Sequence, residues 1–211
     1  MASAEFLSSY WNPLFTIRQD AGVTIKGKRP ILETDARPTA LPLAIREVWT
    51  APDVGWVKVN VDGAYLEDSG EAGIGVIIRD CSGQVLLTAW KYISDAGSAE
   101  EVEAIACKEE LSLAAEWTAR PATVESDCSS IIKSLNQPRT QRSTSAFTIQ
   151  EALDEASRLP KVVFRHVRRE LNSVAHALAQ LARRLNHTAV WRYDAPFCVE
   201  QLVARDVNSP D

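Results

Sequence analysis

The chain lacks a net positive charge, since 23 lysines and arginines stand against 28 aspartates and glutamates and the formal net charge is −5. No global positive field therefore marks a nucleic-acid partner, and any such partner must be bound by a local group of residues. No segment approaches the length of a membrane span, and the first residues lack the charged and apolar regions of a secretion signal. We expect an intracellular protein of the nucleus or cytoplasm that is not secreted and has no membrane partner.

Cysteine and histidine are scarce, with four and three copies among 211 residues. The cysteines are widely separated, and the sequence contains neither a C-x-x-C pair nor a cysteine–histidine group at zinc spacing. This pattern predicts reduced thiols and argues against a structural zinc site. Because 45% of the residues are hydrophobic and 24% are charged, the composition predicts a globular chain that can bury a core.

Regular periodicity is absent from the N-terminal quarter of the chain, where several prolines interrupt scattered apolar residues. We expect a loosely structured leader over residues 1–53, one domain over residues 54–187 and a C-terminal extension over residues 188–211. The change comes at Trp56, after which three valines alternate with Lys58, Asn60 and Asp62. Alternation of this kind is typical of a strand with two different faces, so Asp62 should point away from the valines.

The rest of the domain predicts the order β-β-β-α-β-α-α-β-α, with the first three strands in an antiparallel meander. A helix between the first and fourth strands favours their parallel pairing, which gives an α/β fold with a mixed sheet. Asn172 is the expected N-cap of the last helix. The expected strands cover residues 57–62, 73–79, 84–90, 123–127 and 161–167, and the expected helices cover residues 98–117, 131–135, 145–159 and 173–184.

The helix expected over residues 98–117 carries a carboxylate where an apolar residue is usual. On a helical wheel Glu103 lies at the centre of the apolar arc, and Glu110 lies close to it. A carboxylate that faces a core normally shifts its pKa, pairs with a cation or binds a metal ion. A slightly rotated helix that lets Glu103 reach solvent is the other interpretation.

Two further carboxylates follow strands, Asp62 after the first and Asp127 after the fourth. Each is ordinary by itself, since Asp-Gly often forms a turn and Ser-Asp often caps a helix. With Glu103 they can converge at the carboxyl edge of the sheet, where α/β proteins tend to form ligand sites. Carboxylates that hold two hard cations stabilise phosphodiester cleavage by in-line displacement. Magnesium is the expected metal, with manganese possible, because it prefers oxygen ligands.

Five motifs follow one another within the strands and helices: residues 58–64 (KVNVDGA), 73–80 (GIGVIIRD), 102–106 (VEAIA), 125–127 (ESD) and 166–176 (HVRRELNSVAH). In this order they resemble the type 1 ribonuclease H family, especially its plant retroelement-derived branch. The resemblance implies a ribonuclease H-like fold, a five-stranded mixed sheet flanked by helices, and a substrate of RNA paired with DNA. It also implies that Asp62, Glu103 and Asp127 are catalytic metal ligands, and that His166 is a catalytic histidine that assists proton transfer and product release.

The sequence departs from the family at His176, which stands ten residues after His166 where the resemblance implies a fourth metal-binding aspartate. The wheel places His176 on the polar face of the last helix. Imidazole offers one neutral nitrogen in place of a negative charge and two oxygens, and magnesium prefers oxygen. We expect weaker metal binding and reduced hydrolysis with magnesium, with partial rescue by manganese. A solvated first-turn histidine is the other interpretation.

A local surplus of positive charge lies between residues 156 and 187, where seven basic residues stand against one acid. We expect Arg165, Arg168 and Arg169 to contact phosphates, which gives salt-sensitive affinity without sequence choice. Asn172 and Ser126 are candidate nucleic-acid contacts, because side chains of these types can recognise the 2′-hydroxyls of RNA. An ordinary solvated helix face is the other interpretation of the basic residues.

Three functions remain open at this point. The first is a metal-dependent endonuclease that cleaves the RNA of RNA–DNA hybrids, favoured by the three carboxylates and His166. The second is a catalytically weakened or inactive nucleic-acid-binding module, favoured by His176. The third is a protein-interaction domain, left open by the acidic charge and the extensions at both ends. The sequence carries no signal for an oligomeric state.

Overall fold

The computed structural model describes residues 48–137 and 144–207, so most of the leader expected over residues 1–53 lies outside the described ranges. Its strands are β1 Val57–Tyr65, β2 Ala72–Arg79, β3 Val85–Ile93, β4 Ala122–Ser126, β5 Val162–His166 and β6 Ala189–Arg192, and its helices are α2 Ala99–Trp117, α3 Ser129–Asn136, α4 Ala146–Ala156, α5 Ser173–Leu185 and α6 Phe197–Val207. None of these helices is both long and apolar enough to cross a membrane.

One mixed sheet organises the described residues, with the strand order β5-β4-β1-β2-β3-β6. Strands β1, β2 and β3 form the expected antiparallel meander, and β4 pairs in parallel with β1 as its helical connection requires. Strand β5 pairs in parallel with β4. Because β1, β4 and β5 run in one direction, their carboxyl ends meet at one edge of the sheet.

The sheet has one strand more than the five expected. Strand β6 pairs antiparallel with β3 and comes from the segment that the sequence suggested was a C-terminal extension. It holds four residues, too few to show a period of two. Its Trp191 packs against Trp90 of β3 with ring centroids 4.4 Å apart, so the strand is held by an aromatic contact as well as by the ladder.

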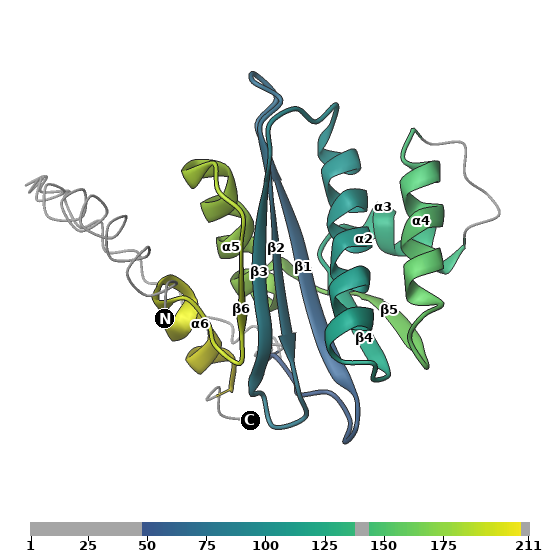
Figure 1. Ribbon diagram of the computed structural model, residues 1–211, viewed down its shortest axis with the longest axis vertical. Coiled ribbons are helices and arrows are strands. Elements are labelled where there is room, and N and C mark those ends of the chain that lie inside the picture. The colour runs from purple at the N-terminus through teal and green to yellow at the C-terminus, as the bar shows by residue number, and fades with distance from the viewer. Residues whose placement is uncertain (1–47, 138–143, 208–211) are drawn as a thin grey trace, which may run out of the picture. The chain divides into compact units, whose positions relative to one another are not determined.

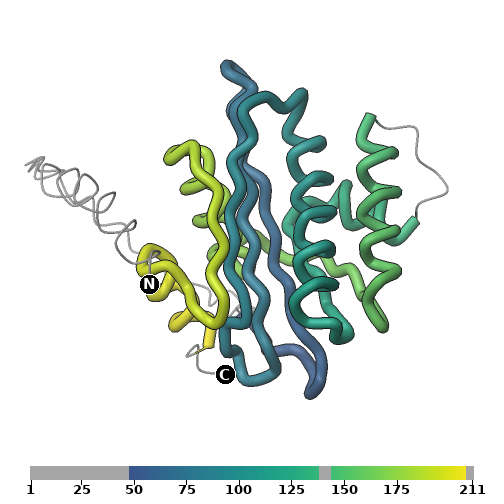
Figure 2. Tube along the Cα trace, in the orientation of Figure 1, coloured from purple at the N-terminus to yellow at the C-terminus, as the bar shows by residue number. Residues whose placement is uncertain are grey.

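Helices cover both faces of the sheet (Figure 1 and Figure 2), with α2, α3 and α4 on one face and α5 and α6 on the other. The three alternating valines of β1 are fully buried in the core under α2. The smaller core under α5 contains Ile77, Trp90, Val174, Leu178, Ala182 and Val199. Asp62 lies on the face opposite the valines, as the alternation predicted, and therefore looks toward α5.

Close packing between α5 and β2 positions the last helix. A Cβ atom at Gly75 would lie 2.2 Å from the carbonyl oxygen of Ala175, so only glycine lets the helix backbone approach this near. Gly75 is the register partner of Asp62 on the neighbouring strand. The first turn of α5, which includes His176, is consequently held beside Asp62.

Candidate metal and nucleic-acid site

Three carboxylates converge at the edge of the sheet where the parallel strands end. One oxygen atom from each of Asp62, Glu103 and Asp127 lies within 4.8 Å of the others. Asn60 of β1 is the parallel register partner of Glu125 of β4, which places Asp62 and Asp127 side by side two residues further on. Glu103 reaches the group from α2.

Gly63 positions Glu103 against β1, a role that the sequence analysis did not assign. The backbone N–H of Gly63 donates a hydrogen bond to the Glu103 carboxylate. A Cβ atom at Gly63 would lie 2.9 Å from Cγ1 of Val102, so a side chain there would push α2 away from the strand. Glycine inside a strand is a recognised sign of close approach, and this was the available signal. The other carboxylate oxygen, Oε2, is buried with no hydrogen-bond partner among the described residues.

The carboxylates lack sufficient counter-charge within the described chain. Burial, together with the charges of Glu103 and Asp127, raises the pKa of Asp62 to about 9. Burial raises the pKa of Glu103 to about 8, again with repulsion from Asp127, while the Gly63 N–H opposes the shift. Arg169 opposes both shifts without cancelling them. Without a bound cation, the group therefore retains protons at neutral pH.

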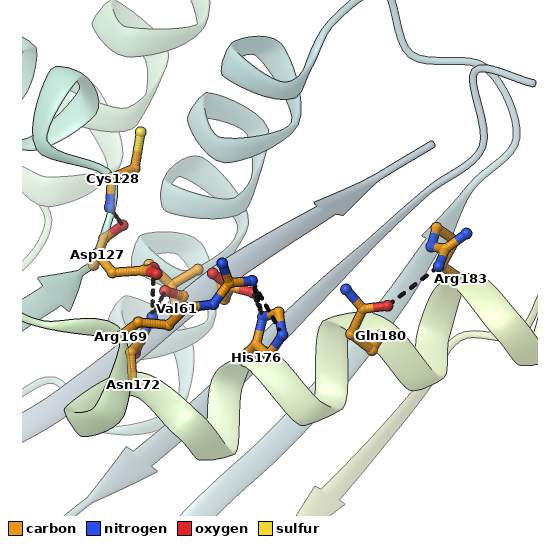
Figure 3. A network of polar contacts seen from close by, with 10 residues as sticks. Val61, Asp127, Cys128, Arg169, Asn172, His176, Gln180 and Arg183 are labelled. Carbon is orange, nitrogen blue, oxygen red and sulfur yellow. Dashed lines mark hydrogen bonds and ion pairs between the residues drawn. The ribbon is translucent and has the colours of Figure 1, made fainter. Parts of the chain in front are cut away.

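His176 faces this group and contacts one of its members. Its Nδ1 lies 2.8 Å from Oδ2 of Asp62. Burial and the nearby Arg169 lower the pKa of His176, while the pKa of Asp62 is raised. The contact is therefore a hydrogen bond between neutral groups at pH 7, not an ion pair. Figure 3 shows Arg169 beside the imidazole, with its Nη2 atom 3.2 Å from both ring nitrogens.

Asn172 joins the last helix to the carboxylates from within the protein. It occupies the N-cap position of α5, as predicted, but its side chain makes no capping hydrogen bond. Its amide instead donates to the carbonyl oxygen of Val61 at 2.7 Å and to Oδ1 of Asp127 at 3.2 Å (Figure 3). Because Asn172 is almost fully buried, we assign it to positioning Asp127 and not to contact with nucleic acid.

Ser126 and His166 also support Asp127, in different ways. The buried Ser126 hydroxyl accepts a hydrogen bond from the N–H of Cys128 at 3.0 Å, which shapes the turn that carries Asp127. The expected contact between Ser126 and nucleic acid therefore does not fit its burial. His166 is exposed at the end of β5, with Nε2 3.2 Å from the carbonyl oxygen of Asp127.

The arginines expected to contact phosphates lie at the surface beside His166. Arg165 is exposed near the end of β5, and Arg168 and Arg169 are exposed at a short 3₁₀ helix, Arg169–Asn172, that leads into α5. The structure thus gathers cationic groups and carboxylates at one edge of the sheet. This arrangement can bind a phosphodiester next to cation ligands.

The donor atoms fit a hard divalent cation. Three carboxylates offer only oxygen, and the buried Oε2 atom of Glu103 has a lone pair that no described donor uses, which is the ligand chemistry of magnesium or manganese. His176 fits less well, because it presents nitrogen and already engages Asp62. Glu110 does not belong to the group. It lies seven residues further along α2, about 10 Å by helical rise, and is fully buried.

The sequence matches the family described as Reverse transcriptase-like over residues 60–182, more than half of the chain. The chain belongs to this family. Thirty-five of its residues are also 54% identical to an Arabidopsis thaliana protein provisionally named a ribonuclease H protein. That segment is 17% of this chain and 6% of the Arabidopsis protein, so the chain matches a small part of its relative.

Solved structures confirm the expected ribonuclease H-like fold. RNase H1 of the halophilic archaeon Halobacterium salinarum superposes with a TM-score of 0.57 at 22% identity, covering 61% of this chain and 97% of that chain. LC11-RNase H1 in complex with an RNA/DNA hybrid gives 0.56 at 22% identity, covering 62% and 98%. A foamy viral protease-reverse transcriptase with an RNA/DNA hybrid gives 0.51 at 14% identity, covering 84% and 26%. At these sequence identities the likeness is one of fold alone. Strand β6 is a sixth strand, in addition to the five that were expected.

Proposed function

We propose that this chain is a divalent-cation-dependent ribonuclease that hydrolyses the RNA strand of RNA–DNA hybrids. The observation that carries the proposal is the convergence of Asp62, Glu103 and Asp127 at the carboxyl edge of the sheet, without enough internal positive charge to neutralise them. Solved neighbours of the same fold hold RNA/DNA hybrids, which supports this substrate class.

Each group at the edge has a role in this proposal. The three carboxylates hold divalent cations, with Asn172 and Gly63 fixing Asp127 and Glu103. Bound cations supply charge stabilisation to the attacking water and the leaving oxygen. His166, exposed and anchored to the backbone of Asp127, moves a proton at the leaving oxygen and helps product release. Arg165 and Arg169 bind the phosphates on either side.

His176 favours a second candidate function, a nucleic-acid-binding module with weak or no hydrolysis. Its hydrogen bond occupies Oδ2 of Asp62, an oxygen that would otherwise be available to a cation. The site also has one ligand charge fewer than an aspartate would give, which lowers its affinity for magnesium. In this candidate the arginines bind nucleic acid, while the three carboxylates bind magnesium too weakly to support full hydrolysis.

Cleavage of a labelled RNA–DNA hybrid, with magnesium or manganese in excess, separates the two candidates. The parent, Asp62→Asn and His176→Asp are compared, with Asp154→Asn as a control that removes an exposed carboxylate of α4 outside the site. We expect cleavage by the parent that is faster with manganese, loss in Asp62→Asn, and a gain in His176→Asp with magnesium. The control should match the parent.

Other results have definite meanings. A silent parent with activity restored in His176→Asp supports the binding module. Silence in both, combined with parental affinity for the hybrid, also removes the ribonuclease proposal but keeps nucleic-acid binding. Failure of the parent to bind a hybrid at low ionic strength contradicts both candidates, because phosphate contacts strengthen as salt falls.

A further inference from the structure

A cluster of arginine and aromatic side chains lies at the C-terminal end of α2, away from the carboxylates. We call the cluster of Trp117, Arg120, Arg192 and Tyr193 the Trp117 patch; these residues line a shallow hollow together with Leu86, Leu87 and Thr118. The Arg192 guanidinium lies 4.3 Å from the Trp117 ring centroid and 5.4 Å from that of Tyr193. Contact with two rings holds a flexible arginine in one orientation.

The Trp117 patch is open to solvent, and its two arginines form no ion pair with the residues that the structure describes. Trp117 is 45% exposed and Tyr193 is 66% exposed. Across residues 48–137 and 144–207, no carboxylate forms an ion pair with Arg120 or Arg192. Asp80 feels the charge of Arg120, but from beyond ion-pair distance. The patch therefore offers two guanidiniums that no described carboxylate pairs with, next to partly exposed aromatic rings.

The backbone at the Trp117 patch adopts unusual conformations. Ala119, directly before Arg120, has φ 48°, and Tyr193, directly after Arg192, has φ 58°. Within the part of the chain that is described, these are two of only three non-glycine residues with positive φ. Such conformations persist where the surrounding structure enforces them, and they concentrate at functional sites.

The dimensions of the hollow decide how a ligand can bind. Its volume is about 70 Å³, well below the roughly 300 Å³ of a pocket that encloses a small molecule. A ligand must therefore lie across the patch, with planar groups on the rings and anionic groups on the guanidiniums. A nucleotide has both parts, a base that stacks and a phosphate that pairs.

We call the group of Asp62, Glu103 and Asp127 at the end of the parallel strands the carboxylate edge. We propose that the Trp117 patch binds a single-stranded nucleic-acid segment that continues from a hybrid bound at the carboxylate edge. Bases are free to stack on side chains only where they are unpaired, which selects a single strand over a duplex. A polyanion also suits two unpaired guanidiniums better than an apolar protein surface, which would leave these charges buried without partners. The inference rests on the proposed nucleic-acid function but uses none of the residues of the carboxylate edge.

The spacing of the two sites sets the length of strand required. Fourteen residues of α2 separate Glu103 from Trp117, about 21 Å by helical rise. At about 3.4 Å per nucleotide this corresponds to roughly six nucleotides. An overhang of about ten nucleotides is therefore long enough to reach the patch from a hybrid held at the carboxylates.

Fluorescence anisotropy with two labelled probes tests the proposal: a blunt RNA–DNA hybrid, and the same hybrid with a single-stranded DNA overhang of about ten nucleotides. All proteins carry Asp62→Asn, so that the probes stay uncut. We expect the overhang to tighten binding about tenfold, and Arg192→Gln or Tyr193→Ser to reduce this gain to about threefold or less, with affinity for the blunt hybrid unchanged. Lys91→Gln is the matched control, because Lys91 is also cationic but already pairs with Glu109 at 2.7 Å; it should keep the gain.

Three results would overturn the proposal. They are an overhang that adds no affinity, a gain that survives both patch substitutions, and an equal gain from an overhang of abasic sites, which has phosphates but no bases to stack. Circular dichroism and thermal unfolding check that the exposed substitutions leave the fold intact. Failure of the proposed function gives a different result: the blunt hybrid is not bound, while a single strand alone is still bound through Arg192.

Discussion

Strand β1 contributes to two polar clusters, and they differ in how their charges are balanced. Toward its start, Lys58 and Asn60 belong to a network whose carboxylates are paired with cations of the chain. Two residues further on, Asp62 belongs to a group of carboxylates that repel one another. Strand β4 repeats the contrast, since Glu125 belongs to the first cluster and Asp127 to the second.

The paired cluster spans the sheet and the chain segments beyond the expected domain. Lys58 contacts Glu125 at 2.7 Å, and Arg79 contacts Asp206 of α6 at 2.8 Å and Asn60 at 2.8 Å. The Arg79 guanidinium also lies 3.9 Å from the ring of Trp49. Every carboxylate in this cluster has a cationic partner, so it has no need of a ligand.

The two clusters differ in whether the fold itself supplies partners for the charges. The paired cluster and Asp62 are buried, while Glu103 and Asp127 are half-buried, and burial of charge is unfavourable unless a partner compensates it. The paired cluster finds its partners within the fold. The carboxylate edge does not, and its compensation must come from protons or from a bound cation.

Breaking the paired cluster should give the largest effect. Arg79→Ala leaves Asp206 buried without its partner, and we expect the free energy of unfolding to fall by about 3–5 kcal/mol. Urea unfolding followed by circular dichroism measures this loss. The double variant Arg79→Met with Asp206→Leu removes both charges and should recover most of the stability. A loss below about 1 kcal/mol in the single variant would mean that the pair is not buried as described.

Asp62→Asn should lower activity but raise stability, in contrast to Arg79→Ala in the paired cluster, which should lower stability. Removal of one ligand charge should lower hybrid hydrolysis at least about 100-fold, equivalent to about 2.7 kcal/mol in the barrier. The same change removes a carboxyl group that must take up a proton on folding when no metal is bound, so the melting temperature without metal should rise. Activity assays and thermal unfolding in a chelator measure both. A fall in the melting temperature would contradict the account of uncompensated charge.

Glu110 tests whether an unsatisfied buried carboxyl group also lies outside the proposed metal site. Both carboxylate oxygens are buried without a hydrogen-bond partner in the described residues. Burial, with a smaller contribution from Glu103, holds the pKa of Glu110 well above its ordinary value. Glu110→Leu should therefore raise the free energy of unfolding by about 1–3 kcal/mol, because it removes an unsatisfied polar group.

The pH dependence of the Glu110 effect has a definite sign. Above the ordinary pKa of 4.5 the unfolded chain loses the Glu110 proton, while the folded chain keeps it. The folded state then binds more protons, so stability contributed at acid pH is lost as pH rises toward the folded pKa. Relative to the parent, Glu110→Gln should gain stability between pH 5 and 8 in urea unfolding. A gain that is constant over this range would contradict a protonated Glu110.

Local patterns in the sequence predicted much of the fold and the convergence of the carboxylates. Alternation placed Asp62 opposite the valines, and the helical wheel found Glu103 in an apolar arc, because both periods are set by backbone geometry alone. Strand β6 was missed, since its formation depends on pairing with β3 and on the contact between Trp191 and Trp90. Periodicity cannot show contacts between distant segments.

Burial of polar side chains was the other feature that the sequence could not supply. Ser126 and Asn172 have the chemistry of nucleic-acid contacts, but the structure buries both and uses them to support Asp127. The hydrogen bond between His176 and Asp62 also depends on how closely α5 packs on Gly75. Residue type indicates what a side chain can bind, whereas packing decides which partners it reaches.

His176→Asp should give the smallest effect, and it tests how one added charge beside Asp62 changes magnesium affinity. A fourth carboxylate beside Asp62 adds ligand charge, so we expect magnesium affinity to rise about tenfold, equivalent to about 1.4 kcal/mol, in isothermal titration calorimetry. The melting temperature in a chelator should fall, because the added charge has no partner without the metal. His176→Asn is the matched control, since it offers an oxygen without a charge and should change affinity little. Equal affinities in all three proteins would mean that position 176 lies too far from the cation to act as a ligand, and that the hydrogen bond to Asp62 only orients the helix.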